Sequence, residues 1–288
     1  MEKLNGQPRK PSSHRAPAEG SWLRLCLGCE SAWRDFLYLV LPAECVVCGR
    51  EDQALCPACS AVLRQQTATP FRAEQAADAL MGVLGRPLLP VVAAGVYRDA
   101  LAETILAFKN HGRTELAAPL GRALARGLGA VAAGVLPGNT GPVIVVPVPS
   151  TASGWRRRGY DPVAMILRAL VREGRLPPGV VVVPLLGFKA RLPWRRHHQK
   201  GLGRSARRRN MRNTMKVRKK MLRSVWLRAN LCEALVVVVD DVLTTGSTLR
   251  EAAKTLEISG LGVCAGVVLA AARAPDGGHE ISPRKRLD

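Results

Sequence analysis

Residues 236–248 read VVVVDDVLTTGST, and the class of the fold can be inferred from this run of residues. Four consecutive valines lead into two aspartates, and a turn rich in threonine, glycine and serine follows them. An unbroken valine run is typical of a strand buried on both faces, which occurs mainly in parallel sheets. Serine and threonine are frequent where a helix begins. The stretch therefore predicts a strand, a polar loop and a helix of an α/β protein.

Short apolar runs alternate with helix-like segments on either side of this stretch. Strands are predicted at residues 91–97, 143–148, 180–185, 235–239 and 263–269, and helices at residues 22–41, 99–109, 116–128, 162–172 and 247–258. The alternation from residue 91 onward predicts a parallel sheet with helices on both faces. Ligands of such sheets bind beyond the carboxyl ends of the strands, which is where the polar residues after the valines are expected.

These polar residues have the chemistry of a sugar-phosphate site. Consecutive backbone N–H groups of residues 243–248, at a helix N-terminus, form an anion site, and Gly246 permits a tight turn there. Asp240 and Asp241 can accept hydrogen bonds from vicinal ribose hydroxyls or hold a divalent ion indirectly, and they would stabilise positive charge on the ribose. The alternative, an acidic turn before a capped helix, explains only one or two residues of the stretch. Further hydroxyl donors are Thr244, Thr245, Ser247 and Thr248.

Two Cys-x-x-Cys pairs, separated by seven residues, predict a metal site formed by Cys45, Cys48, Cys56 and Cys59. Four thiolates at this spacing are typical of a structural Zn²⁺ site. Reduced cysteines in a small core are the alternative. A third pair, Cys26 and Cys29, has no evident partner pair, and small buried residues are the simpler explanation of it.

The charge of the chain is strongly positive and unevenly distributed. Lys and Arg total 43 against 22 Asp and Glu, and the net charge of +21 favours phosphate-bearing partners. Residues 189–223 hold fifteen Lys or Arg and no acidic residue. No apolar run approaches the roughly 18 residues that span a bilayer, and the first residues lack the apolar core of a signal peptide. We therefore expect a cytoplasmic protein with no membrane partner.

Taken together, these features resemble the ComF family, competence-related proteins that are similar to amidophosphoribosyltransferases. The resemblance covers about residues 33–270 and rests on residues 33–63, 97–112 (YRDALAETILAFKNHG), 146–160 (VPVPSTASGWRRRGY), 199–210 and 236–248. It implies an α/β fold of the type I phosphoribosyltransferase kind behind a small zinc ribbon. It also implies binding of 5-phosphoribosyl-1-pyrophosphate (PRPP) together with Mg²⁺.

The resemblance assigns roles to individual residues. Asp240 and Asp241 would be catalytic and bind the ribose hydroxyls. The PRPP-binding residues would be Val242, Leu243, Thr244, Thr245, Gly246, Ser247 and Thr248. The pyrophosphate would meet Arg156, Arg157 and Arg158 in a loop at residues 150–159, and a mobile hood at residues 191–223 would carry Gln199, Arg204 and Arg209. For the three consecutive arginines, an exposed basic turn is the alternative.

The sequence predicts a modular organisation and leaves two functions open. The predicted parts are a disordered tail (1–20), a zinc-ribbon module (21–64), a linker (65–90), a phosphoribosyltransferase-like domain (91–272) and a second tail (273–288). The first function is transfer of ribose 5-phosphate from PRPP to an unidentified nitrogen acceptor. The alternative is binding of single-stranded DNA through residues 189–223 for DNA uptake or processing, with a non-catalytic PRPP site. An aromatic content of 4% argues against a base-stacking channel.

Overall fold

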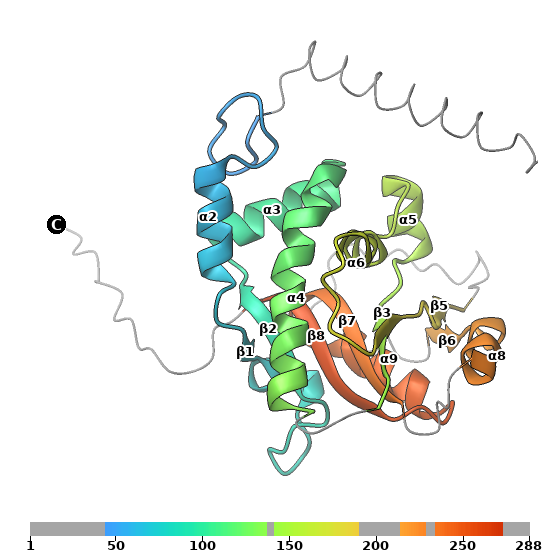
Figure 1. The fold of residues 1–288 in the computed structure, drawn as a ribbon. Coiled ribbons are helices and arrows are strands. Elements are labelled where there is room, and N and C mark those ends of the chain that lie inside the picture. Colours follow the sequence, from blue (N-terminus) through green and yellow to red (C-terminus); the bar gives the residue numbers. More distant parts are fainter. Residues whose placement is uncertain (1–43, 137–140, 190–213, 229–233, 273–288) are drawn as a thin grey trace, which may run out of the picture.

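The computed structural model describes residues 44–136, 141–189, 214–228 and 234–272. Within these ranges the chain is an α/β protein in which helices flank a mostly parallel mixed sheet (Figure 1). The predicted fold class is therefore confirmed at this level. Some predictions fall outside the described residues, namely the two tails, the helix at residues 22–41, Cys26, Cys29, Gln199, Arg204 and Arg209.

The main sheet has six strands in the order β1-β2-β8-β7-β3-β4 among the described residues. Their bounds are β1 (Phe71–Arg72), β2 (Val91–Val96), β3 (Val143–Pro147), β4 (Val180–Val182), β7 (Leu235–Leu243) and β8 (Val263–Ala271). Strands β2, β8, β7, β3 and β4 are parallel to one another, whereas β1 pairs with β2 in the antiparallel direction. Strand β4 ends earlier than the predicted residue 185, since Pro184 cannot donate to a strand ladder.

Helices cover the two faces of the sheet unequally (Figure 1). On one face lie α3 (Asp99–Asn110), α4 (Ala117–Gly134) and α6 (Pro162–Arg172), next to α2 (Pro57–Gln66). On the other lie α9 (Ser247–Glu257) and a small sheet of β5 (Leu186–Phe188) and β6 (Met215–Val217). The remaining elements are α5 (Ala152–Arg158), α8 (Lys219–Arg228), η1 (Glu74–Ala76), η2 (Asp78–Leu80) and η3 (Thr114–Leu116). Of the helices in the described ranges, none is both long and apolar enough to cross a membrane.

Strand β7 lies inside the sheet, between β3 and β8, and its valines are buried on both sides. Val236 and Val238 pack into the apolar cluster under α9, while Val237 and Val239 pack into the cluster under the opposite helices. Full burial of a valine side chain contributes about 1.5–3 kcal/mol. The start of the loop after β7 is therefore fixed by four buried side chains.

The segment at residues 65–90, predicted as a linker, packs onto the sheet over part of its length. It supplies strand β1, and the side chains of Leu80 and Leu89 are buried in the cluster under α9. Glu74 is also buried, and its Oε2 accepts a hydrogen bond of 3.1 Å from the backbone N–H of Val91. These contacts join distant residues, so the local sequence pattern gives little sign of them.

Candidate functional site

The loop after β7 is short because β7 ends at Leu243 and α9 begins at Ser247. Gly246 precedes α9 with a φ of +73°, a conformation that favours glycine. A Cβ atom at this residue would lie 2.5 Å from Cγ of Leu80. Glycine is thus required both by the backbone angle and by the close approach of η2.

Several backbone N–H groups of the loop are not paired with a backbone acceptor among the described residues. Within the described part of the chain, the N–H groups of residues 244–248 donate no hydrogen bond to another backbone group. The hydroxyl oxygens of Thr245 and Ser247 are 2.9 Å apart. Such an array at a helix N-terminus attracts phosphate, because the helix dipole adds partial positive charge there.

The 65–90 segment forms a hydrogen bond with this loop. The backbone N–H of Ala79 donates a hydrogen bond of 3.1 Å to the carbonyl oxygen of Thr245. Together with the packing of Leu80 against Gly246, it holds the loop from the side of η2. Sequence reasoning missed both residues, since neither belongs to a motif.

Asp240 and Asp241 lie near the carboxyl end of β7, and each side chain is partly buried. The backbone N–H of Asp241 donates a hydrogen bond of 2.8 Å to Oδ1 of Asp240. Desolvation and, after it, the neighbouring charge of Asp241 raise the pKa of the Asp240 carboxyl to about 8. That group therefore holds its proton near neutral pH without a ligand, whereas hydrogen bonds from a ligand would favour the charged form.

Lys109 is a site residue that the sequence did not single out as one. Its Nζ lies 2.8 Å from Oδ2 of Asp241, although it comes from the last turn of α3, far away in the chain. The two side chains are only 28% and 15% exposed. A lysine in the last turn of a helix is also favoured by the helix dipole alone, which requires no partner, so the sequence gives no reason to single it out.

The end of α3 is itself fixed. The hydroxyl of Tyr160 donates a hydrogen bond to the carbonyl oxygen of Phe108, and the two rings pack with centroids 5.7 Å apart. Phe108 is 1% exposed. Desolvation also raises the pKa of the Tyr160 hydroxyl, which favours its role as a donor. The hydrogen bond and the ring contact at Phe108 therefore fix the backbone directly before Lys109.

Residues 150–159 were expected to form a loop, but most of them form the short helix α5; that they bind pyrophosphate stays a prediction. Thr151 caps the helix by accepting a hydrogen bond of 3.1 Å from the N–H of Gly154. Gly159 ends it with a φ of +77°. Helix α5 is too short for an apolar period to reveal it, so only the two capping residues could have indicated it.

The three arginines of α5 have different surroundings. Arg156 and Arg157 are exposed, while Arg158 is partly buried. Nη2 of Arg158 donates a hydrogen bond of 3.2 Å to Oγ of Ser150. Its Nε is buried and has no hydrogen-bond partner among the described residues. Two of the three guanidinium groups are therefore open to an external anion, and the third is held against its own loop.

Asp161 connects this region to the acid pair. Its Oδ2 accepts a hydrogen bond of 2.7 Å from the N–H of Ser150, and its Oδ1 accepts one of 3.1 Å from Ala164 at the start of α6. Its charge contributes to the raised pKa of Asp240. The carboxyl edges of β3 and β7 therefore bring these carboxyl groups within electrostatic range of each other.

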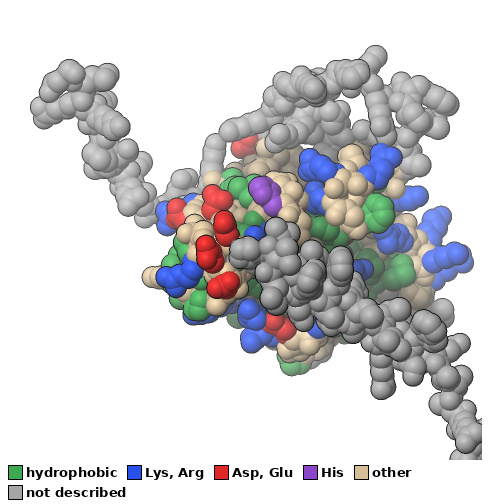
Figure 2. All heavy atoms as spheres, turned by 90° about the horizontal axis from the view of Figure 1, so that it is seen from above, with side chains coloured by type: hydrophobic (Ala, Val, Ile, Leu, Met, Phe, Trp, Pro, Cys, Tyr) green, Lys and Arg blue, Asp and Glu red, His purple; other side chains and the backbone are tan. Residues whose placement is uncertain are grey.

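Charge is separated across the face seen in Figure 2. Asp and Glu side chains gather on the side of α2 and α3, and Lys and Arg gather on the side of α5 and α8. The basic side includes exposed side chains of α5 and α8: Arg156, Arg157, Lys219, Lys220 and Arg223. A multiply charged anion is therefore attracted to the α5 and α8 side of the molecule.

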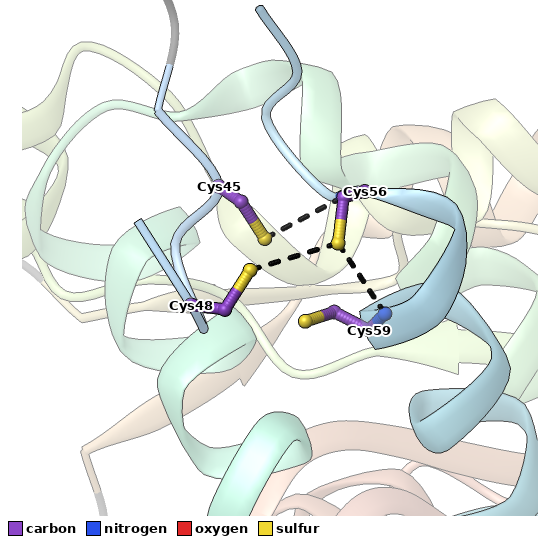
Figure 3. A group of neighbouring side chains, drawn as sticks. All are labelled: Cys45, Cys48, Cys56 and Cys59. Carbon is purple, nitrogen blue, oxygen red and sulfur yellow. Dashed lines mark hydrogen bonds between the residues drawn. The ribbon is translucent and has the colours of Figure 1, made fainter. Parts of the chain in front are cut away.

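Cys45, Cys48, Cys56 and Cys59 form a second candidate site, and their thiols point toward one another (Figure 3). All four Sγ atoms lie within 4.8 Å of one another, and those of Cys48 and Cys56 are 3.7 Å apart. Tetrahedral zinc with bonds of about 2.3 Å separates its sulfur ligands by about 3.8 Å. The cluster therefore has the donors and the spacing to hold a metal ion.

Backbone groups around the cluster favour thiolate at two of its positions. Burial opposes ionisation of Cys45, but hydrogen bonds from backbone N–H groups outweigh it and lower the pKa of this thiol to about 6. The N–H of Cys59, 3.5 Å from Sγ of Cys56, lowers the pKa of Cys56. Burial raises the pKa of Cys59, so a metal ion would have to displace this proton.

The cysteine cluster is attached to the main body of the protein. Leu55 and Val46 pack against the apolar cluster under α3 and α4. Cys56 is also the residue that caps α2.

Comparison of the chain with protein-family models and with curated proteins gave no match.

Proposed function

We propose that the protein binds PRPP with Mg²⁺ at residues 240–248 and transfers its ribose 5-phosphate to a nitrogen acceptor, as a type I phosphoribosyltransferase of the ComF kind. The observation that carries this proposal is the direct succession of an acid pair, a turn at Gly246 and a helix N-terminus at the end of a buried strand. The acids suit a sugar diol and the N–H groups suit a phosphate. Along the chain, three to eight residues separate an aspartate of the pair from an N–H group of residues 244–248.

In this proposal each group has a limited task. The N–H groups of residues 244–248 bind the 5′-phosphate. Asp240 and Asp241 accept hydrogen bonds from the ribose hydroxyls. When the bond from C1 to pyrophosphate breaks, its electron pair leaves with pyrophosphate, and the carboxylates stabilise the positive charge left on the ribose. The lone pair of the acceptor nitrogen then forms the new bond to C1, and that nitrogen loses a proton.

Mg²⁺ fits the site as a companion of the ligand. Lys109 already engages one oxygen of Asp241, so the acid pair offers few direct donors to a metal ion. Mg²⁺ commonly binds through substrate phosphates and water, with few protein ligands. Bound in this way, it would neutralise charge on the departing pyrophosphate. We propose that Arg156 and Arg157, which are exposed on α5, contact the same group.

Release of pyrophosphate from PRPP, measured across a panel of bases and ammonia, tests the catalytic proposal. The parent protein is expected to accelerate release with at least one acceptor in the presence of Mg²⁺. The double variant Asp240→Asn, Asp241→Asn is expected to lose that acceleration, because the amides carry no negative charge. Equal rates in the parent and the double variant would contradict the proposal.

For the cysteine cluster we propose a structural zinc ion. Its four Sγ atoms lie within 4.8 Å of one another, and three of the four cysteines are buried. A catalytic zinc ion normally keeps a position for water, whereas four cysteine ligands fill the coordination sphere. The ion would join the turn at Cys45 to the start of α2.

Single-stranded DNA binding remains a second candidate, and an exposed aromatic residue favours it. Trp155 is 54% exposed in α5 and is followed directly by Arg156 and Arg157. Stacking of bases on an aromatic ring beside basic residues is a common mode of single-strand binding. A salt titration tests this candidate, because phosphate contacts make affinity fall as salt rises. A slope near zero, or equal binding by Trp155→Ala, would rule out the α5 surface.

A further inference from the structure

Each aspartate of the acid pair has one oxygen engaged by the protein. Oδ1 of Asp240 accepts the hydrogen bond from the N–H of Asp241, and Oδ2 of Asp241 meets Nζ of Lys109, each at 2.8 Å. The other two oxygens, Oδ2 of Asp240 and Oδ1 of Asp241, accept no hydrogen bond from the described residues. When hydrogen bonds from a ligand favour the ionised form of Asp240, the pair offers two adjacent acceptors, one from each residue.

The ion pair of Lys109 with Asp241 differs from an ordinary surface ion pair. The ion pair is largely withdrawn from solvent, so it is screened less than an exposed pair. The residue before it, Phe108, is buried and held by the Tyr160 hydroxyl, which limits where the lysine side chain can reach. Its charge also opposes the rise in the pKa of Asp240. Lys109 thus both orients one carboxylate and reduces the repulsion between the two.

We propose that Lys109 is a positioning residue, which fixes Asp241 so that one oxygen of each aspartate is presented to the two vicinal hydroxyls of a ribose. This inference rests on the proposed function, because it places a 5-phosphoribosyl ligand in the site. It specifies the ligand more closely, as a ribose 5-phosphate group whose hydroxyls are both present. A 2-deoxy sugar would leave one desolvated carboxylate oxygen without a donor, and such unpaired groups strongly disfavour binding.

A purely structural ion pair predicts a different result. Its loss would weaken the fold or lower the affinity for every ligand of the site to a similar extent. A positioning role instead changes the ratio of affinities for ribose 5-phosphate and 2-deoxyribose 5-phosphate. Inorganic phosphate, which needs only the loop N–H groups, reports whether the rest of the site is intact.

Calorimetric titration of these three ligands tests the inference. The parent protein is expected to bind ribose 5-phosphate at least about tenfold more tightly than its 2-deoxy analogue. The loss of one hydrogen bond to a charged group lowers affinity by about that factor or more. In Lys109→Met the ratio is expected to fall toward one, while phosphate still binds. Lys109→Arg keeps the charge and is expected to recover part of the ratio. Lys254→Met, the same change at an exposed lysine of α9, is the matched control and should keep the parent ratio.

The outcomes separate the two proposals. If Lys109→Met keeps the parent's ratio of affinities for ribose 5-phosphate and 2-deoxyribose 5-phosphate, the positioning role is wrong. The proposed function is not affected by that result. A parent protein that binds neither ribose 5-phosphate nor PRPP would overturn both. Should Lys109→Met fail to bind phosphate, Lys109→Gln replaces it, because glutamine can still donate to Asp241 without charge. An unchanged ratio in that variant, together with an unchanged ratio in Lys109→Arg, would equally overturn the role of the lysine charge.

Discussion

Leu80 packs against Gly246 so closely that a Cβ atom on residue 246 would meet its side chain at 2.5 Å. The contact links a segment before the first parallel strand to the loop that precedes α9. The same segment forms a second contact with the loop, because the N–H of Ala79 donates a hydrogen bond to the carbonyl oxygen of Thr245. The geometry of the candidate phosphate site therefore depends on residues well outside the motif.

Gly246→Ala is expected to destabilise the protein by about 1–3 kcal/mol, because it adds both an overpacked methyl group and a strained backbone angle. It should also weaken phosphate binding. Urea unfolding measures the first effect and calorimetry the second. Gly129→Ala in α4 is the control, since nothing lies within 4 Å of a Cβ there. Equal changes in the free energy of unfolding of the two variants would show that the contact with Leu80 does not contribute to stability.

Leu80→Ala tests the same contact from the other side. Alone, it should cost about 2–5 kcal/mol, as expected for a fully buried leucine. In combination with Gly246→Ala, the total loss should be smaller than the sum of the two single losses, because the smaller side chain leaves room for the new methyl group. Strict additivity in a double-mutant cycle would contradict the packing described above.

The stability of the protein should fall with rising pH because of Asp240. Its folded-state pKa of about 8 lies above the ordinary value of 3.8 for an aspartate, so the folded state keeps a proton that the unfolded chain releases. Relative to Asp240→Asn, the free energy of unfolding should therefore be highest below pH 4 and fall by up to about 1.4 kcal/mol per pH unit until about pH 8. Urea unfolding of both proteins at pH 5 and pH 8 measures the difference. Parallel pH dependence would exclude the raised pKa.

Metal analysis of the purified protein should find a single zinc ion for each chain, held by the cysteine cluster. Cys56→Ser is expected to lose it, and a chelator should lower the free energy of unfolding of the parent by several kcal/mol. Cys264→Ser serves as the matched control, because Cys264 lies outside the cluster and its thiol donates to the carbonyl oxygen of Val236, as a serine hydroxyl can. Full zinc content in Cys56→Ser would exclude this cysteine as a ligand.

Local patterns in the sequence were sufficient to predict the strand, loop and helix at residues 236–248 and the cysteine cluster. In both cases the determining residues are close together in the chain, and their spacing reflects the local geometry directly. The class of the fold followed from the alternation of apolar runs with helix-like segments, and the structure confirms it. The antiparallel strand β1 was missed because two residues show no period.

Contacts between distant segments could not be predicted in this way. The ion pair of Lys109 with Asp241 joins the end of α3 to the end of β7, and no feature of either local sequence specifies the other. The same holds for Leu80 and Gly246. Thr151 and Gly159 did carry a readable signal as the two caps of α5, but the helix between them is too short to show an apolar face.

Calorimetric titration of the protein with PRPP in the presence of Mg²⁺ tests whether the end of β7 binds a 5-phosphoribosyl ligand. We expect saturable binding by the parent protein and a loss of at least about tenfold in affinity in the double variant Asp240→Asn, Asp241→Asn, since each charged hydrogen bond contributes about 1.5–3 kcal/mol. Inorganic phosphate should still bind to the double variant. Absence of PRPP binding by the parent, or equal affinity in both proteins, would contradict the claim that the end of β7 is a 5-phosphoribosyl site.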